Sequence, residues 1–156
     1  MICTAKHIDR ISWGLDMISN ILLATDGSVP SERATEFVAS LARRYHAKVV
    51  VLHAYTPVPG NNQSQSYSRA LYETAEEAAS LVEQVAQRLN ELGATHVETD
   101  VMEGPAANVI IGVAESCSPD LIVVGARGNS TWQGLLLGSV SMVVTQRAEC
   151  PVLIVK

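Results

Sequence analysis

The chain is poor in aromatic residues and has no long apolar segment. Aromatic residues make up 4% of its 156 residues although 47% are hydrophobic, so the core must be built from aliphatic side chains and alanine. No apolar run approaches the roughly 18 residues that a membrane helix needs. Residues 1–17 contain no continuous apolar stretch typical of a signal peptide. We therefore expect one cytoplasmic domain with no membrane partner.

Paired cysteines, metal-ligand spacing and clustered positive charge are also missing. Cys3, Cys117 and Cys150 form no CxxC pattern, and no two histidines stand at positions i and i+4. This argues against a disulfide framework and against a zinc site. The net charge is −5, and no cluster of lysine and arginine occurs. Because phosphate contacts need concentrated positive charge, we expect no nucleic-acid partner.

Short apolar runs alternate with helical periodicities after residue 17. Strands are predicted at 20–24, 48–55, 95–102, 120–125 and 151–156; helices are predicted from Ser28 to Tyr45, along the stripe Leu71–Leu92, from Gly104 to Cys117, and from Ser139 to about Arg147. Strands separated by helices imply a parallel sheet with helices on both faces. We predict a single α/β domain over residues 18–156, preceded by an N-terminal arm at 1–17.

Two loops combine glycine with hydroxyl residues directly after an apolar strand. The first is "ATDGS" (Ala24–Ser28), and the second is the segment from Gly125 to Ser141. Open parallel sheets bind ligands at the carboxyl ends of their strands, where the strand order reverses. If the first and fourth strands are neighbours, these two loops face each other across that point.

The glycines of the second loop suggest a site for a polyphosphate. Gly125 has no Cβ, so a sugar or base can approach its backbone closely. Gly128 allows a positive φ, which turns successive N–H groups into one concavity. Gly138 and Ser139 open a helix, whose N-terminus favours anions, and the hydroxyls of Ser139 and Ser141 add donors. Gly128 and Gly138 are then two anchor points for one anion.

Each of these features also has a plainer interpretation. Gly125 and Gly128 are compatible with a simple turn after a strand, and Ser139 with a helix N-cap. Asp26 before a glycine is typical of an Asx turn. His53, on an apolar strand, is more often a hydrogen-bonded core histidine than a base or a ligand. The segment also lacks GK[ST], so the usual P-loop lysine is absent.

The chain resembles the universal stress protein family from Ser19 to Lys156. The resemblance rests on "ILLATDGS", on "VVVLHAY" and on "DLIVVGARG…GSVSMVVTQRAECPVLIVK". Its most specific part is the spacing of Gly125, Gly128, Gly138 and Ser139. Two residues separate the first two glycines, nine separate Gly128 from Gly138, and the serine follows directly. This resemblance implies the strand order 3-2-1-4-5, a homodimer and membership of the subgroup that binds ATP.

The resemblance also implies which residues meet the nucleotide. Three segments match contacts to adenine and ribose, and the glycine segment matches a triphosphate cradle. The residues carried over are Ala24, Thr25 and Asp26 for adenine and ribose, Ala54 for a backbone contact to adenine, Val124 and Gly125 for ribose, and Arg127, Gly128, Gly138, Ser139, Val140 and Ser141 for the phosphates. Mg²⁺ or Mn²⁺ would be held through the phosphates.

These expectations favour an ATP-binding regulatory protein of the stress response, acting as a nucleotide-dependent dimeric switch. The strand Pro151–Lys156 would pair with its twin, because a short apolar edge strand needs cover. Bound nucleotide would order residues 129–137, where Trp132 would report occupancy to a regulatory partner of unknown identity. The alternative is an enzyme, a slow ATPase or a nucleotidyl-transfer catalyst, in which Asp26 positions water or metal. No catalytic residue is assigned otherwise.

Overall fold

The computed structural model describes the backbone of residues 18–56, 65–128 and 137–156, and the side chains of these ranges except 65–73. In chain order the elements are β1 (Asn20–Ala24), α1 (Val29–Tyr45), β2 (Lys48–Tyr55), α2 (Gln65–Glu91), β3 (Val97–Glu103), α3 (Ala106–Cys117), β4 (Leu121–Gly125), α4 (Ser139–Arg147) and β5 (Val152–Val155). Each predicted element is present. The largest difference is that α2 begins at Gln65, ahead of the apolar stripe. The predicted arm at 1–17 lies outside the described residues.

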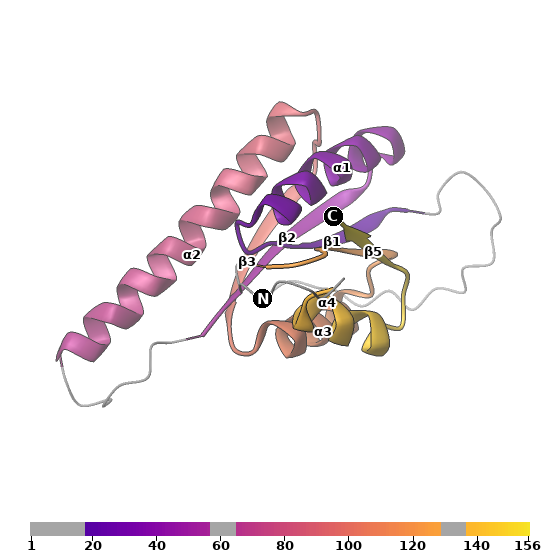
Figure 1. Ribbon diagram of the computed structural model, residues 1–156. Helices are drawn as coiled ribbons and strands as arrows, with labels where there is room; N and C mark the ends of the chain where they lie inside the picture. The colour runs from indigo at the N-terminus through magenta and orange to yellow at the C-terminus, as the bar shows by residue number, and fades with distance from the viewer. Residues whose placement is uncertain (1–17, 57–64, 129–136) are drawn as a thin grey trace.

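All pairings in the sheet are parallel, and the strand order is β3-β2-β1-β4-β5. Helices α1 and α2 lie on one face of the sheet, and α3 and α4 lie on the other (Figure 1). The predicted fold class and strand order are therefore confirmed. Within the described part of the chain, no helix has the length and apolarity needed to cross a bilayer.

The core consists of two aliphatic layers, one on each face of the sheet. On one face, Ile21 and Leu23 of β1 are fully buried and pack with Val38 of α1. On the other face, Leu22 packs with Ile110 of α3. Alternate residues of a strand point to opposite faces, so a strand covered on both sides must be apolar throughout. This is why β1 reads as one continuous apolar run.

The two edges of the sheet differ in their side chains. At one edge, β3 exposes Glu98, Thr99 and Asp100, and Glu98 lies 2.7 Å from Lys48 Nζ. Charged residues protect an edge strand from pairing with other chains. At the other edge, every residue of β5 is partly exposed and apolar. Only the β3 edge therefore carries its own charged protection.

The helix predicted from Ser28 begins at Val29, with Ser28 at the N-cap position. Pro30 occupies the first turn, and the Ser28 side chain makes no capping hydrogen bond to the helix. The Ser28 carbonyl accepts the first helical bond, from Glu32 N–H at 3.0 Å. The hydroxyl of Ser28 is directed instead to the loops at the end of the sheet.

Candidate functional site

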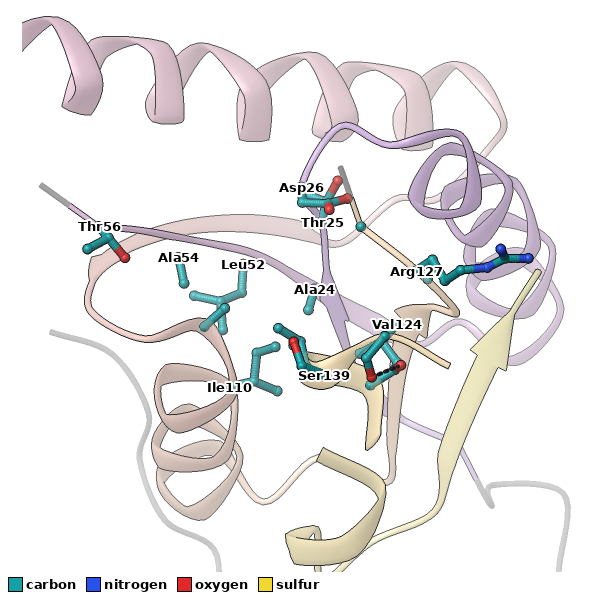
Figure 2. Close-up of a pocket in the computed structure, with 16 residues that line it drawn as sticks. Ala24, Thr25, Asp26, Leu52, Ala54, Thr56, Ile110, Val124, Arg127 and Ser139 are labelled. Carbon is teal, nitrogen blue, oxygen red and sulfur yellow. Dashed lines mark hydrogen bonds between the residues drawn. The ribbon is translucent and has the colours of Figure 1, made fainter. Parts of the chain in front are cut away.

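A cavity of about 600 Å³ opens at the carboxyl ends of the strands, on the face covered by α3 and α4. This volume is within the usual range for a small-molecule site. Its lining includes every site residue predicted from the sequence (Figure 2). The lining residues are Ala24, Thr25, Asp26, Leu52, Ala54, Thr56, Ala106, Ile110, Val124, Gly125, Arg127, Gly128, Gly138, Ser139, Val140 and Ser141.

The cavity lies where the strand order reverses. Strand β1 pairs with β2 on one side and with β4 on the other, with Ala24 opposite both Leu52 and Val124. The loops after β1 and β4 therefore leave the sheet side by side, as expected if the first and fourth strands are neighbours. This is the position at which open parallel sheets bind ligands.

Four lining residues were not predicted from the sequence. Leu52 and Thr56 flank Ala54 on β2 and just beyond it, while Ala106 and Ile110 belong to α3. Ile110 points from α3 toward the strand that carries Leu52 and Ala54 (Figure 2). The polar Thr56 directly after an apolar strand was a usable signal. The apolar residues carried none, because they look like any other core residue.

The backbone of Ala54 faces the cavity with both of its hydrogen-bonding groups. Leu52 C=O accepts from Thr25 N–H at 2.9 Å, so Leu52 points its backbone groups toward β1. Tyr55 C=O accepts from Gly104 N–H at 2.8 Å, on the opposite side. Backbone groups of alternate residues share an edge of the strand. Those of Ala54 therefore point to the β1 side, where β1 has already ended.

Gly128 is a glycine for a different reason from the one predicted. Among the described residues, positive φ angles at glycine occur at Gly27, Gly93 and Gly104 and not at Gly128, so that expectation is wrong. A Cβ on Gly128 would instead overlap Asp26 Oδ2. The absence of a side chain lets the loop after β4 lie against the carboxylate of the loop after β1.

Gly125 also serves the packing of the protein. A Cβ at this position would come within 3.1 Å of Pro30 Cβ and of Ser31 N. The missing side chain thus makes room for the start of α1, on the face of the sheet away from the cavity. Gly125 nevertheless lines the cavity, and close approach of a sugar or base to its backbone stays a prediction.

The N-terminus of α4 presents fewer free donors than predicted. Gly138 occupies the N-cap position, which corrects the N-cap interpretation of Ser139, and its N–H donates to Ala126 C=O at 2.7 Å. Ser141 is 2% exposed, and its hydroxyl lies 3.0 Å from both Ala126 C=O and Gly138 C=O. These bonds join α4 to the end of β4. They also engage two donors that had been assigned to an anion.

Three backbone donors remain at this helix end. The first helical bond of α4 runs from Met142 N–H to Gly138 C=O. The N–H groups of Ser139, Val140 and Ser141 precede it and have no acceptor within the helix. All three residues line the cavity. Together with the helix dipole they form a site that favours an anion.

The loop after β1 is ordered by its own carboxylate. Asp26 Oδ1 accepts from Ser28 N–H at 3.1 Å and from Ser28 Oγ at 2.6 Å, which confirms the Asx turn. His53 Nδ1 lies 2.7 Å from Thr25 C=O. Because a carbonyl only accepts, Nδ1 carries the proton and donates it. His53 is therefore hydrogen-bonded, as the plainer interpretation has it, but it is half-buried and does not belong to the core.

Side-chain charge contributes little to the cavity. Arg127 is exposed, and its guanidinium points away from Ser139 and from the cavity (Figure 2). No group of three or more histidine, cysteine or acidic side chains suited to a metal occurs in the described ranges. The bridge at 129–136, including Trp132, lies outside those ranges. Within the described lining, the attraction for an anion comes from peptide amides.

Sequence comparison identifies close relatives of this chain. The model of the universal stress protein family matches residues 17–156. Universal stress protein MJ0531 of Methanocaldococcus jannaschii is 32% identical over 148 residues, which cover 92% of this chain and 85% of that protein. A universal stress protein of Thermus aquaticus is 34% identical over 140 residues, which cover 90% of this chain and 100% of the relative.

Solved structures share the fold. Universal stress protein UspA from Lactobacillus plantarum superposes with a TM-score of 0.80 at 24% identity, over 89% of this chain and 98% of that one. A universal stress protein in complex with cAMP gives 0.69 at 29% identity, over 88% and 96%. A family member from Arabidopsis thaliana with AMP bound gives 0.64 at 22% identity, over 88% and 91%.

Proposed function

The chain belongs to the universal stress protein family, and from that premise we propose that its cavity binds an adenine nucleotide, with ATP as the resident ligand. The protein would act in the cytoplasm as a dimeric stress-response regulator whose state depends on nucleotide occupancy. The cAMP complex of a relative at 29% identity supports binding of the adenine nucleotide class. The preference for ATP rests on the glycine and serine spacing of Gly125, Gly128, Gly138 and Ser139.

The observation that carries the proposal is the arrangement of donors and acceptors along the cavity. One end offers the backbone N–H and C=O of Ala54. Adenine carries an amino donor beside a ring-nitrogen acceptor on its pairing edge, so it matches such a pair. The other end offers the amides of Ser139, Val140 and Ser141 to a phosphate. The apolar walls between the ends suit a planar base and a sugar.

The sheet and α3 supply those apolar walls. Ala24, Leu52 and Val124 line the cavity from the sheet, and Ile110 faces them from α3. Small residues on the strands leave space for a ring between the sheet and the helix. We propose that the base lies in this slot and that the ribose lies near Thr25, Asp26 and Gly125.

A triphosphate brings more negative charge than three amides neutralise. The described lining contains no lysine, and the Arg127 guanidinium points away from the cavity. A divalent cation such as Mg²⁺ or Mn²⁺ fits this shortage, because phosphate oxygens are suitable ligands for it. Such a cation would be held mainly through the phosphates. We therefore expect ATP affinity to depend on a divalent cation more strongly than AMP affinity does.

The free edge of β5 supports the proposed homodimer. Its four residues are partly exposed and apolar. Arg33 Nη1 donates to Lys156 C=O at 3.1 Å, which places α1 beside the end of this strand. Val29 and Phe37, one turn to each side of Arg33, are 58% and 49% exposed. Pairing of two β5 strands about a two-fold axis would cover both the edge and this flank.

The enzymatic alternative rests on Asp26. It is the acidic side chain in the described lining, and it would position water or metal for slow ATP hydrolysis. Its Oδ1 already accepts two hydrogen bonds from Ser28, which favours a structural role. Binding without efficient turnover is thus the function that we propose.

Mass spectrometry of the small molecules released by denaturing the purified protein tests the proposal. We expect ATP, and we expect calorimetry on nucleotide-free protein to show binding of ATP in the presence of Mg²⁺. Chromatography after incubation with ATP and Mg²⁺ should recover intact ATP. Failure to bind any adenine nucleotide would refute the binding function, and rapid formation of product would favour the enzyme.

A further inference from the structure

Ser28 stands at the N-cap position of α1 without capping the helix. A serine at this position normally accepts a hydrogen bond from an amide of the first turn, but no such bond is present. The residue is 6% exposed. It is not part of the cavity lining, although Asp26 and Arg127, to which its hydroxyl bonds, both are. A buried hydroxyl that gives up its usual partner must be satisfied elsewhere.

The partners of this hydroxyl belong to two different loops. Ser28 Oγ lies 2.6 Å from Asp26 Oδ1, in the loop after β1, and 3.2 Å from Arg127 C=O, in the loop after β4. The hydroxyl has a single proton, which the two acceptors share, and the shorter bond to a charged oxygen takes the larger part. The Ser28 N–H adds a second bond to Asp26 Oδ1 at 3.1 Å.

Ser28 is itself held firmly by α1. Its C=O accepts from Glu32 N–H at 3.0 Å and from Ser31 Oγ at 2.8 Å. The hydroxyl therefore connects the rigid start of a helix to a residue 99 positions further along the chain. It is suited to hold the loop after β4 at a fixed distance from the loop after β1.

The loop that Ser28 holds is one side of the proposed phosphate site. Arg127 precedes Gly128, whose backbone lies so close to Asp26 Oδ2 that a Cβ there would overlap it. Loss of the hydroxyl would remove the shorter of the two bonds from Ser28 to Asp26 Oδ1 and leave the bond from the N–H. The carboxylate would then be held less firmly, and a shift toward the anion would repel it. The position of the carboxylate and the position of Gly128 therefore depend on the same hydroxyl.

We propose that Ser28 is a positioning residue for the phosphate end of the nucleotide site. It acts through Asp26 and Arg127 and touches no ligand. This inference rests on the proposed function, and it makes a prediction specific to one part of the ligand. The base end, at Leu52, Ala54 and Ile110, has no hydrogen bond to Ser28, so loss of the hydroxyl should weaken binding of the phosphates most, affect the ribose beside Asp26 less, and spare the base.

The test compares adenosine, AMP and ATP by calorimetry in three variants. Ser28→Ala removes the hydroxyl, and Ser28→Thr retains one. Ser40→Ala is the matched control, because Ser40 lies on the exposed side of α1 and its hydroxyl bonds only within the helix, to Glu36 C=O at 3.2 Å. For Ser28→Ala we expect a loss of about tenfold or more for AMP and ATP. Adenosine, which has a ribose but no phosphate, should lose clearly less affinity than AMP. All affinities of Ser40→Ala should remain those of the wild type.

Recovery of AMP affinity in Ser28→Thr would support positioning by the hydroxyl. Equal losses for adenosine and AMP in Ser28→Ala, or no loss at all, would overturn it. A second measurement does not depend on nucleotide binding: the amide resonance of Gly128 in nucleotide-free protein should shift more in Ser28→Ala than in Ser40→Ala, because the Arg127 C=O of the same peptide group loses its bond to the hydroxyl. If the wild type binds no nucleoside or nucleotide, the proposed function fails, and an unchanged Gly128 resonance would separately refute the role of Ser28.

Discussion

Replacement of Gly138 by valine is the sharpest test of the amide-based anion site. Gly138 has φ −75° and ψ 163°, which any residue can adopt. A Cβ would lie 3.4 Å from Ala126 C=O and from Arg127 Cα, an ordinary contact. The two γ-methyl groups of valine extend beyond this Cβ. We expect them to crowd the α4 amides and the space that a phosphate would occupy.

The expected cost to the fold is small. The bond from the N–H of residue 138 to Ala126 C=O, at 2.7 Å, involves backbone atoms that valine keeps. Valine is a poorer N-cap than glycine, which lowers the free energy of unfolding by about 1 kcal/mol. The cost to binding is larger, because a phosphate excluded from the α4 amides loses charge-assisted hydrogen bonds of about 1.5–3 kcal/mol each. Loss of two such bonds lowers affinity by about a hundredfold or more.

Calorimetric titration of nucleotide-free protein with ATP and Mg²⁺ measures this loss, and thermal unfolding checks the fold. Gly112→Val is the matched control. It makes the same substitution on the exposed side of α3, where a Cβ meets no atom within 4 Å, and it should retain wild-type affinity. Equal ATP affinity in Gly138→Val and wild type would show that the α4 amides do not hold the phosphate.

Three other predictions follow from particular contacts. Gly128→Ala should lower the free energy of unfolding by about 1–3 kcal/mol, because the new Cβ overlaps Asp26 Oδ2. In a protein that already carries Asp26→Ala, the same substitution should cost less. An equal cost with and without Asp26→Ala would contradict the overlap. Burial raises the pKa of the Cys150 thiol, so alkylation of this thiol should begin at higher pH in the folded than in the unfolded protein. The contribution of the thiol to stability is present below the unfolded pKa and is lost as the pH rises through the folded pKa. Identical pH profiles for alkylation of the folded and unfolded protein would disprove this. Phe37→Asp should shift a dimer to monomer in sedimentation experiments without unfolding, because the ring is 49% exposed beside the β5 edge; a dimer that persists would exclude this flank from the interface.

The order of the elements followed from local pattern. A strand buried on both faces must be apolar throughout, as in β1 and β4, and a helix on a sheet must carry an apolar stripe, as along α2. These periods depend on residues a few positions apart, so the sequence reveals them directly. Chain order then required parallel strands, and parallel strands place their loops at one edge. The loops at Asp26 and Gly128 were predicted to meet if the first and fourth strands are neighbours. The family resemblance implied that neighbour pair, and β1 does pair with β4.

The same patterns did not predict what each residue does once the loops meet. A side chain at Gly128 would contact Asp26, and one at Gly125 would contact Pro30. In each pair the two residues are about a hundred positions apart in the sequence. The Ser141 hydroxyl bonds to Ala126 C=O, and the Arg127 guanidinium points away from the cavity. Ile110 lines the cavity only because α3 packs over β2.

By itself the sequence determined the elements, their parallel order and the edge at which a site would form, because these depend on short-range periodicity and chain direction. The tertiary structure decided which donors stay free and which glycines serve packing. A hydrogen bond or a steric contact is set by whichever atom lies within about 3 Å, and in this fold that atom often comes from a distant segment.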